Sequence, residues 1–189
     1  PENAPRGRVS AAAWVDGSGK FWLFGGTNYD YWVKLNDLWR WDGVYWTWMS
    51  GSTRFNESGV YGTLGVSAPG NVPGARYGSS SWTDLNGNLW LSGGNGGLND
   101  LWRWDGTNWA WMSGTAALNQ PGVYGDLGVP SPANTPGGRS EAASWADAQG
   151  RFWLFGGNGR DSTSARGTLR DLWAYEPPSC SPPVATITA

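Results

Sequence analysis

The chain has 189 residues, of which 16 are Trp, 30 are Gly and 12 are Pro, while only 15% are charged and the formal net charge is −2. So many turn-forming residues argue against long helices, and the absence of a basic run argues against nucleic acid and anionic membrane surfaces as partners. No stretch approaches 18 consecutive apolar residues, so we expect no membrane insertion.

The first elements expected in the chain are the two strands of a β-hairpin, at 10–16 ("SAAAWVD") and 20–26 ("KFWLFGG"). The turn between them begins at Asp16 and carries two glycines, which is a hairpin signal. A third strand is expected at 37–42 ("DLWRWD") and a fourth at 45–50 ("YWTWMS"). No apolar pattern with the helical period of 3.6 residues competes with this interpretation.

The third strand carries large side chains on both of its faces. Trp39 and Trp41 share one face, because they alternate with Leu38, Arg40 and Asp42. This is the pattern expected of a sheet that is packed between two other sheets. We therefore interpret the tryptophans of these two strands, and their counterparts in the repeats described below, as packing residues between neighbouring sheets. They are Trp39, Trp41, Trp46, Trp48, Trp102, Trp104, Trp109, Trp111 and Trp173.

The same elements recur twice further along the chain. The nine residues "LNDLWRWDG" that start at Leu35 return unchanged from Leu98, and an altered copy, "LRDLWAYEP", starts at Leu169. Four short strands that recur with a Gly pair and aromatic markers indicate propeller blades. We expect an all-β fold of about three four-stranded blades, the last one incomplete, with boundaries near 1–72, 73–135 and 136–176.

The recurring strings resemble a known repeat family. "WLFGG", a variable loop, "LNDLW" and a closing Trp-rich strand are similar to kelch repeats of the Trp-rich bacterial type, such as those in the propeller of galactose oxidase. The resemblance implies a β-propeller. The units are longer than the usual repeat of about 50 residues, mainly through a segment that contains "GVYG". Three units also fall short of the six or seven blades that a closed kelch ring implies.

The third unit departs from the pattern after Glu176. "PPSCSPP" predicts a stiff, extended linker, and the β-branched "VATITA" predicts a terminal strand, so 177–189 is interpreted as a linker plus a strand. That strand either fills the outer position of the third blade or leaves it to another strand. The assembly candidates here are Val184, Thr186, Ile187, Thr188 and the single cysteine, Cys180, which is spare or pairs outside the chain.

An arc of three blades exposes an apolar flank at each end. Burying such a face is worth roughly 25 cal/mol per Å², and terminal repeats usually carry a polar outer face, which neither end shows. Three arrangements would cover the flanks. Two chains close a ring by two-fold symmetry, chains continue head to tail as a filament, or the chain is a piece of a longer protein with further blades.

The residue types argue against catalysis. The chain contains no His, which removes the commonest general base and metal ligand, including any histidine ligand for the copper of galactose oxidase. Cys180 has no partner for nucleophilic chemistry. We expect no enzyme activity, no metal site and no cofactor.

The repeated charged residues have structural interpretations. One aspartate recurs in each third strand and is expected to pair with a turn or with the arginine that recurs in each unit; the aspartates are Asp37, Asp100 and Asp171, and the arginines are Arg8, Arg76 and Arg139. A second set begins the hairpin turns and is expected to form Asx turns, namely Asp16, Asp84 and Asp147. Arg40 and Arg103, flanked by Trp, are expected to stack on aromatic rings.

One inserted loop is a candidate ligand site. Tyr29, Asp30, Tyr31 and Trp32 form an aromatic and acidic cluster without a counterpart in the other units. Loops of unequal length on a rigid scaffold commonly carry binding sites, and exposed Trp faces stack on sugar rings. This loop would therefore bind glycans, or it would serve as a packing or assembly contact.

The few charges and the Ser/Thr/Asn-rich surface suit an extracellular or cell-surface protein, and the start "PENAP" is typical of a mature or trimmed product. We expect a non-catalytic extracellular structural module that self-associates through its blade flanks and C-terminal strand, as a dimeric ring or a filament. Its partners would be copies of itself. The alternatives are a carbohydrate-binding, lectin-like propeller and the propeller portion of a larger secreted enzyme.

Overall fold

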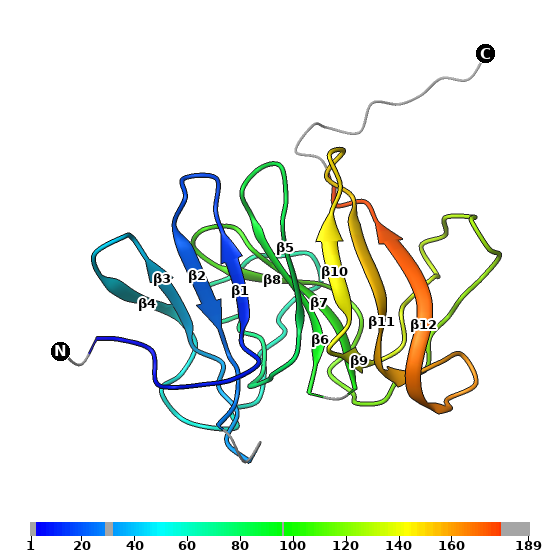
Figure 1. Cartoon of the computed structure of the whole chain (residues 1–189), viewed down its shortest axis with the longest axis horizontal. Coiled ribbons are helices and arrows are strands. Elements are labelled where there is room, and N and C mark those ends of the chain that lie inside the picture. The colour runs from blue at the N-terminus through cyan, green and yellow to red at the C-terminus, as the bar shows by residue number, and fades with distance from the viewer. Residues whose placement is uncertain (1–2, 29–31, 96, 179–189) are drawn as a thin grey trace.

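The computed structural model describes residues 3–28, 32–95 and 97–178, in which three antiparallel sheets lie side by side in chain order (Figure 1). Sheet 1 has the order β1 (Ala12–Val15), β2 (Phe21–Phe24), β3 (Leu38–Trp41) and β4 (Trp46–Ser50). Sheet 2 has the order β5 (Ser80–Thr83), β6 (Leu89–Gly94), β7 (Leu98–Trp104) and β8 (Trp109–Ser113). The predicted all-β fold of four-stranded antiparallel sheets is confirmed. None of the described residues forms a helix that could span a membrane.

Sheet 3 is built differently from the other two. It contains β9 (Arg139–Ser140), β10 (Ala143–Ala146), β11 (Phe152–Arg160) and β12 (Arg166–Tyr175). Both β9 and β10 pair with the same edge of β11, so the sheet is only three strands wide. Among the described residues no strand pairs with the outer edge of β12, the edge that corresponds to the β4 side of β3 and the β8 side of β7. The assembly candidates Cys180, Val184, Thr186, Ile187 and Thr188 lie outside the described residues.

The hairpin turns are held by their first aspartate. In sheet 2 the Oδ1 of Asp84 accepts hydrogen bonds from the backbone N–H groups of Asn86 at 3.0 Å and Asn88 at 2.9 Å. Its Oδ2 accepts one from the indole Nε1 of Trp90 at 2.9 Å. Asp16 and Asp147 make the same bonds in the other sheets. The predicted Asx turns are confirmed, and each also orients a tryptophan of the following strand.

The Gly pair of each unit has positive φ values, and in sheets 2 and 3 the register of the second strand shifts there. Gly93 and Gly94 have φ values of 66° and 97°, and the register between β6 and β7 shifts there. A Cβ on Gly93 would lie 2.7 Å from the backbone oxygen of Arg139. Only glycine tolerates both this conformation and this approach. The pair therefore lets sheet 2 lie close to the segment that enters sheet 3.

Aromatic residues form the core between adjacent sheets. One cluster lies between sheets 1 and 2 and contains Ala12, Trp14, Trp22, Phe24 and Leu38 from sheet 1 with Leu89, Leu91, Trp102, Trp104 and Trp109 from sheet 2. A second lies between sheets 2 and 3 and contains Trp82, Trp90, Phe152 and Leu154, with Trp173 and Tyr175 packed against it. Within the described residues, sheet 2 is thus covered on both faces, whereas sheets 1 and 3 are each covered on one.

Candidate functional site: the two uncovered sheet faces

A buried ion pair recurs in each sheet. Arg8 pairs with Asp37 at 2.6 Å, Arg76 with Asp100 at 2.6 Å and Arg139 with Asp171 at 2.7 Å. Each arginine uses both terminal nitrogens on the two carboxylate oxygens, the strongest geometry for such a pair. The predicted pairing of the repeated arginines and aspartates is confirmed.

In two of these pairs, the aspartate also accepts a hydrogen bond from a tyrosine in the segment that connects one sheet to the next. The hydroxyl of Tyr61 donates to Asp100 at 2.6 Å and that of Tyr124 to Asp171 at 2.5 Å. Sequence reasoning did not assign these tyrosines, although the repeated "GVYG" was the signal that could have found them. The extra length of the units therefore serves to connect one sheet to the next.

The pKa shifts keep the carboxylate and the hydroxyl of the sheet 3 cluster in one charge state near neutral pH. Burial alone would raise the pKa of Asp171, but hydrogen bonds from Arg139, Tyr124 and Trp173 outweigh it and lower the pKa to about 2. Burial and the bond to Asp171 raise the pKa of Tyr124 to about 12. Neither group changes its charge near neutral pH, as a general acid or base at that pH would have to do.

This shift predicts a specific acid response. The folded pKa of Asp171 lies below its ordinary value of 3.8, so the carboxylate stabilises the fold above that value, and this contribution is lost as the pH falls toward about 2. We expect the urea midpoint to fall over this interval, and to fall less steeply in Asp171→Asn. The Asn variant should start from a lower midpoint at neutral pH. Equal slopes for the two proteins would contradict the assignment.

Each sheet has two faces that differ in what they contact. We call the face toward the following sheet the forward face and the one toward the preceding sheet the rear face. The forward face of sheet 1 carries Trp14, Trp22 and Phe24 and packs on the rear face of sheet 2, which carries Leu89, Leu91, Trp102, Trp104 and Trp109. The forward face of sheet 2 carries Trp82 and Trp90 and packs on the rear face of sheet 3.

The junction between sheets 1 and 2 has a defined aromatic geometry. The ring of Phe24 lies 5.4 Å from that of Trp109 in an edge-to-face arrangement, and Trp22 lies 6.4 Å from Trp104. The indole Nε1 of Trp14 donates to the backbone oxygen of Trp90 at 3.0 Å. The junction between sheets 2 and 3 repeats this bond, from Trp82 to the backbone oxygen of Trp153 at 3.2 Å.

The rear face of sheet 1 has no covering sheet in the described chain. It carries Phe21, Leu23, Trp41, Trp46 and Trp48, at positions equivalent to the buried rear face of sheet 2. The Trp46 ring contacts those of Trp41 at 5.5 Å and Phe21 at 6.3 Å. Trp48 is 47% exposed, in contrast to the packing position expected for it. The row of three sheets therefore has a partly exposed aromatic face on its sheet 1 side.

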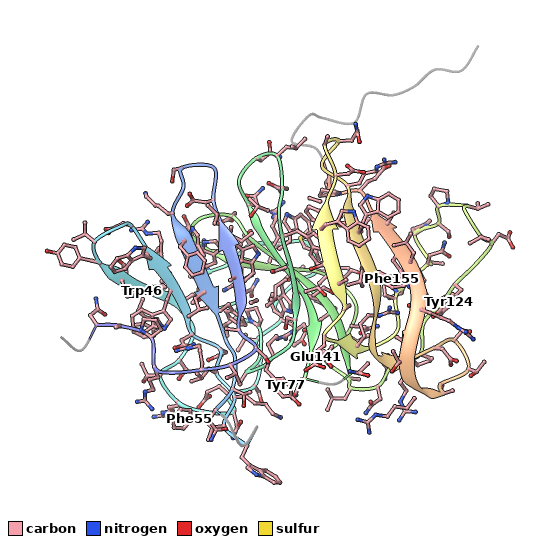
Figure 2. All side chains as sticks on the ribbon, viewed as in Figure 1. Trp46, Phe55, Tyr77, Tyr124, Glu141 and Phe155 are labelled. Carbon is pink, nitrogen blue, oxygen red and sulfur yellow. The ribbon has the colours of Figure 1, made fainter. Side chains whose placement is uncertain are left out.

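The forward face of sheet 3 is uncovered in the same way. It carries Trp145, Trp153, Phe155 and Leu172, of which Trp145, Phe155 and Leu172 are exposed. Trp145 stacks on Trp153 with ring centres 6.2 Å apart, and the Arg151 guanidinium lies 5.5 Å from the Trp153 ring. Figure 2 shows Trp46 and Phe155 on the sheets at opposite ends of the row.

The predicted ligand loop is only partly described. Tyr29, Asp30 and Tyr31 lie outside the described residues, whereas Trp32 is 80% exposed. Trp32 lines an open cavity of about 440 Å³ together with Lys34, Asn56, Glu57, Asn95 and Leu118. The cation–π contact predicted for Arg40 is present, because its guanidinium lies 5.8 Å from the Trp22 ring. No group of three His, Cys, Asp or Glu in the described parts of the chain could hold a metal ion.

Comparisons with known proteins give only a distant structural likeness. No protein-family model and no curated protein sequence matches the chain. Among solved structures it is similar to one described as a novel fungal alcohol oxidase with catalytic diversity among the AA5 family, in complex with copper. The TM-score is 0.45 and the sequence identity 10%, over 90% of this chain and 28% of that one. A likeness this distant assigns neither a family nor an activity.

Proposed function

We propose that the chain is a non-catalytic structural module, built of kelch-like β-propeller blades, that associates with copies of itself outside the cell through its two uncovered faces. The observation that carries this proposal is a contrast in burial at equivalent positions. Trp145 is 45% exposed, whereas Trp14 and Trp82 are 4% and 6% exposed. Phe21 is 39% exposed, whereas Leu89 and Phe152 are 1% and 2% exposed.

Physical chemistry supports a role in assembly. Apolar surface gains roughly 25 cal/mol per Å² when it leaves water, and contiguous exposed aromatic faces typically mark interaction sites. Repeat arrays that end in solvent normally carry a polar terminal face. Here both terminal faces carry tryptophan and phenylalanine, so a protein partner of matching shape is the occupant we infer.

The solution mass of the purified chain tests the proposal. We expect light scattering to find a dimer or larger species that dissociates on dilution, and negative-stain microscopy to show closed rings or filaments. Trp32→Ala serves as the matched control, because it removes an exposed tryptophan outside both faces and should leave the mass unchanged. A monomer at the highest concentration reached would contradict self-association and favour further blades within a longer chain, such as a larger secreted enzyme.

A second candidate function is carbohydrate binding. It is favoured by the exposed indole of Trp32 beside the 440 Å³ cavity, whose other lining groups include the polar side chains of Lys34, Asn56 and Glu57. A flat indole with neighbouring polar groups suits the apolar face and hydroxyls of a sugar ring. We expect saturable binding on a glycan array to fall to background in Trp32→Ala. Tyr45→Ala, which truncates an exposed aromatic residue elsewhere, should bind like the parent protein.

A further inference from the structure

The two uncovered faces carry the same aromatic residues as the junction between sheets 1 and 2. By strand register, Trp14, Trp22 and Phe24 of sheet 1 correspond to Trp145, Trp153 and Phe155 of sheet 3. On the other side of the junction, Trp104 and Trp109 on the rear face of sheet 2 correspond to Trp41 and Trp46 on the rear face of sheet 1. All five correspondences join identical residue types, whereas Leu89 of sheet 2 corresponds to Phe21 of sheet 1.

From this identity we propose that the forward face of sheet 3 docks head to tail on the rear face of sheet 1 of a second copy, in the register of the internal junction. The inference rests on the proposed self-association and specifies its geometry. Phe155 packs edge to face on the partner's Trp46, as Phe24 packs on Trp109 within the chain. Trp153 lies against the partner's Trp41, as Trp22 lies against Trp104.

A hydrogen bond fixes the register of the docked faces. Within the chain, the Nε1 groups of Trp14 and Trp82 each donate to a backbone oxygen of the next sheet, that of Trp90 and Trp153 respectively. Trp145 occupies the third such position, and its Nε1 donates to the backbone oxygen of the partner's Trp22. A shift of one face along the other would carry the Trp145 Nε1 away from this oxygen and leave it without its hydrogen bond.

The two faces differ from each other, so the contact is head to tail and not face to equivalent face. Among the described residues no strand lies outside β12, so the forward face of sheet 3 has no counterpart of β4, whereas the rear face of sheet 1 has Trp46 and Trp48 on β4. Two copies that dock in this way through both faces close a ring, and successive copies that do not close form a filament. Both products contain the same interface.

Two singly blocked variants test the direction of docking. Phe155→Glu places a carboxylate on the forward face and Phe21→Glu places one on the rear face; both residues are exposed in the single chain, so we expect both variants to fold. Burying an unpaired carboxylate should weaken association by about 100-fold. Each variant alone should be monomeric, and their equimolar mixture should form a one-to-one dimer through the two intact faces.

The outcomes separate this inference from the proposed function. If the parent protein is monomeric, self-association itself fails. If the parent associates but Phe21→Glu alone still dimerises, forward faces pair with each other and the head-to-tail geometry is wrong. If the mixture of blocked variants stays monomeric while the parent associates, some other surface mediates assembly and the inference fails as well.

Discussion

Replacement of Arg76 by methionine is expected to lower the free energy of unfolding by about 3–5 kcal/mol, the range observed when one partner of a buried ion pair is removed. The side chains of Arg76 and Asp100 are 1% and 0% exposed, and the guanidinium also donates to the backbone oxygen of Gly93 at 3.0 Å. Without Arg76, a buried carboxylate remains with only Tyr61 and Trp102 as donors. Urea denaturation of Arg76→Met in the Phe155→Glu background measures this loss without a contribution from assembly.

The control for this prediction is the surface ion pair of sheet 3. Arg151 donates to Asp147 at 2.8 Å, but its side chain is substantially exposed. Arg151→Met should cost less than about 1 kcal/mol, as is usual for exposed pairs. A double variant, Arg76→Met with Asp100→Leu, should lose less than the sum of its single variants, because it removes the stranded charge. An Arg76→Met protein as stable as Arg151→Met would show that the buried pair does not hold the fold.

Truncation of Trp90 to alanine is expected to cost about 3–5 kcal/mol, the range for deleting a buried large aromatic side chain. Trp90 is fully buried in sheet 2, where its ring lies 5.4 Å from that of Phe152 and 5.7 Å from that of Tyr175, both on sheet 3. Its indole also holds the turn aspartate, Asp84. The substitution therefore removes packing between two sheets and one buried hydrogen bond. Chemical denaturation in the Phe155→Glu background gives the size of the effect.

Trp153→Ala is the matched control, because Trp153 occupies the same position in sheet 3. Its indole makes the same bond to a turn aspartate, Asp147, at 2.9 Å, but no sheet covers it in the described chain. We expect its truncation to cost clearly less than that of Trp90 in the monomeric background. In the parent protein, the two costs should approach each other when assembly buries Trp153. Equal costs in the monomer would mean that the covering sheet adds little to the stability of Trp90.

The positions of the strands follow from the sequence because their causes are local. Alternation around Trp39 and Trp41, and the turn that begins at Asp16, predict the strands of sheet 1 within a residue or two of those observed, whereas β11 and β12 of sheet 3 extend further than predicted. The Arg76 to Asp100 pair was also predictable, since both residues recur once in each unit. The turns and the alternation depend on neighbouring residues, and the ion pair joins residues that recur in every unit. A single sequence displays both kinds of pattern.

What the tertiary structure alone decided is which face of each sheet is covered, and by what. An alternating strand has two faces, but its pattern does not say on which side the next sheet lies. The sequence therefore predicted a packing position for Trp48, and only the arrangement of the sheets shows that Trp48 and Trp145 are exposed while Trp102 and Trp82 are buried. The contact from Tyr61 to Asp100 depends likewise on how the connecting segment crosses to the next sheet. Burial depends on the position of residues distant in sequence, so the two uncovered faces become visible only in three dimensions.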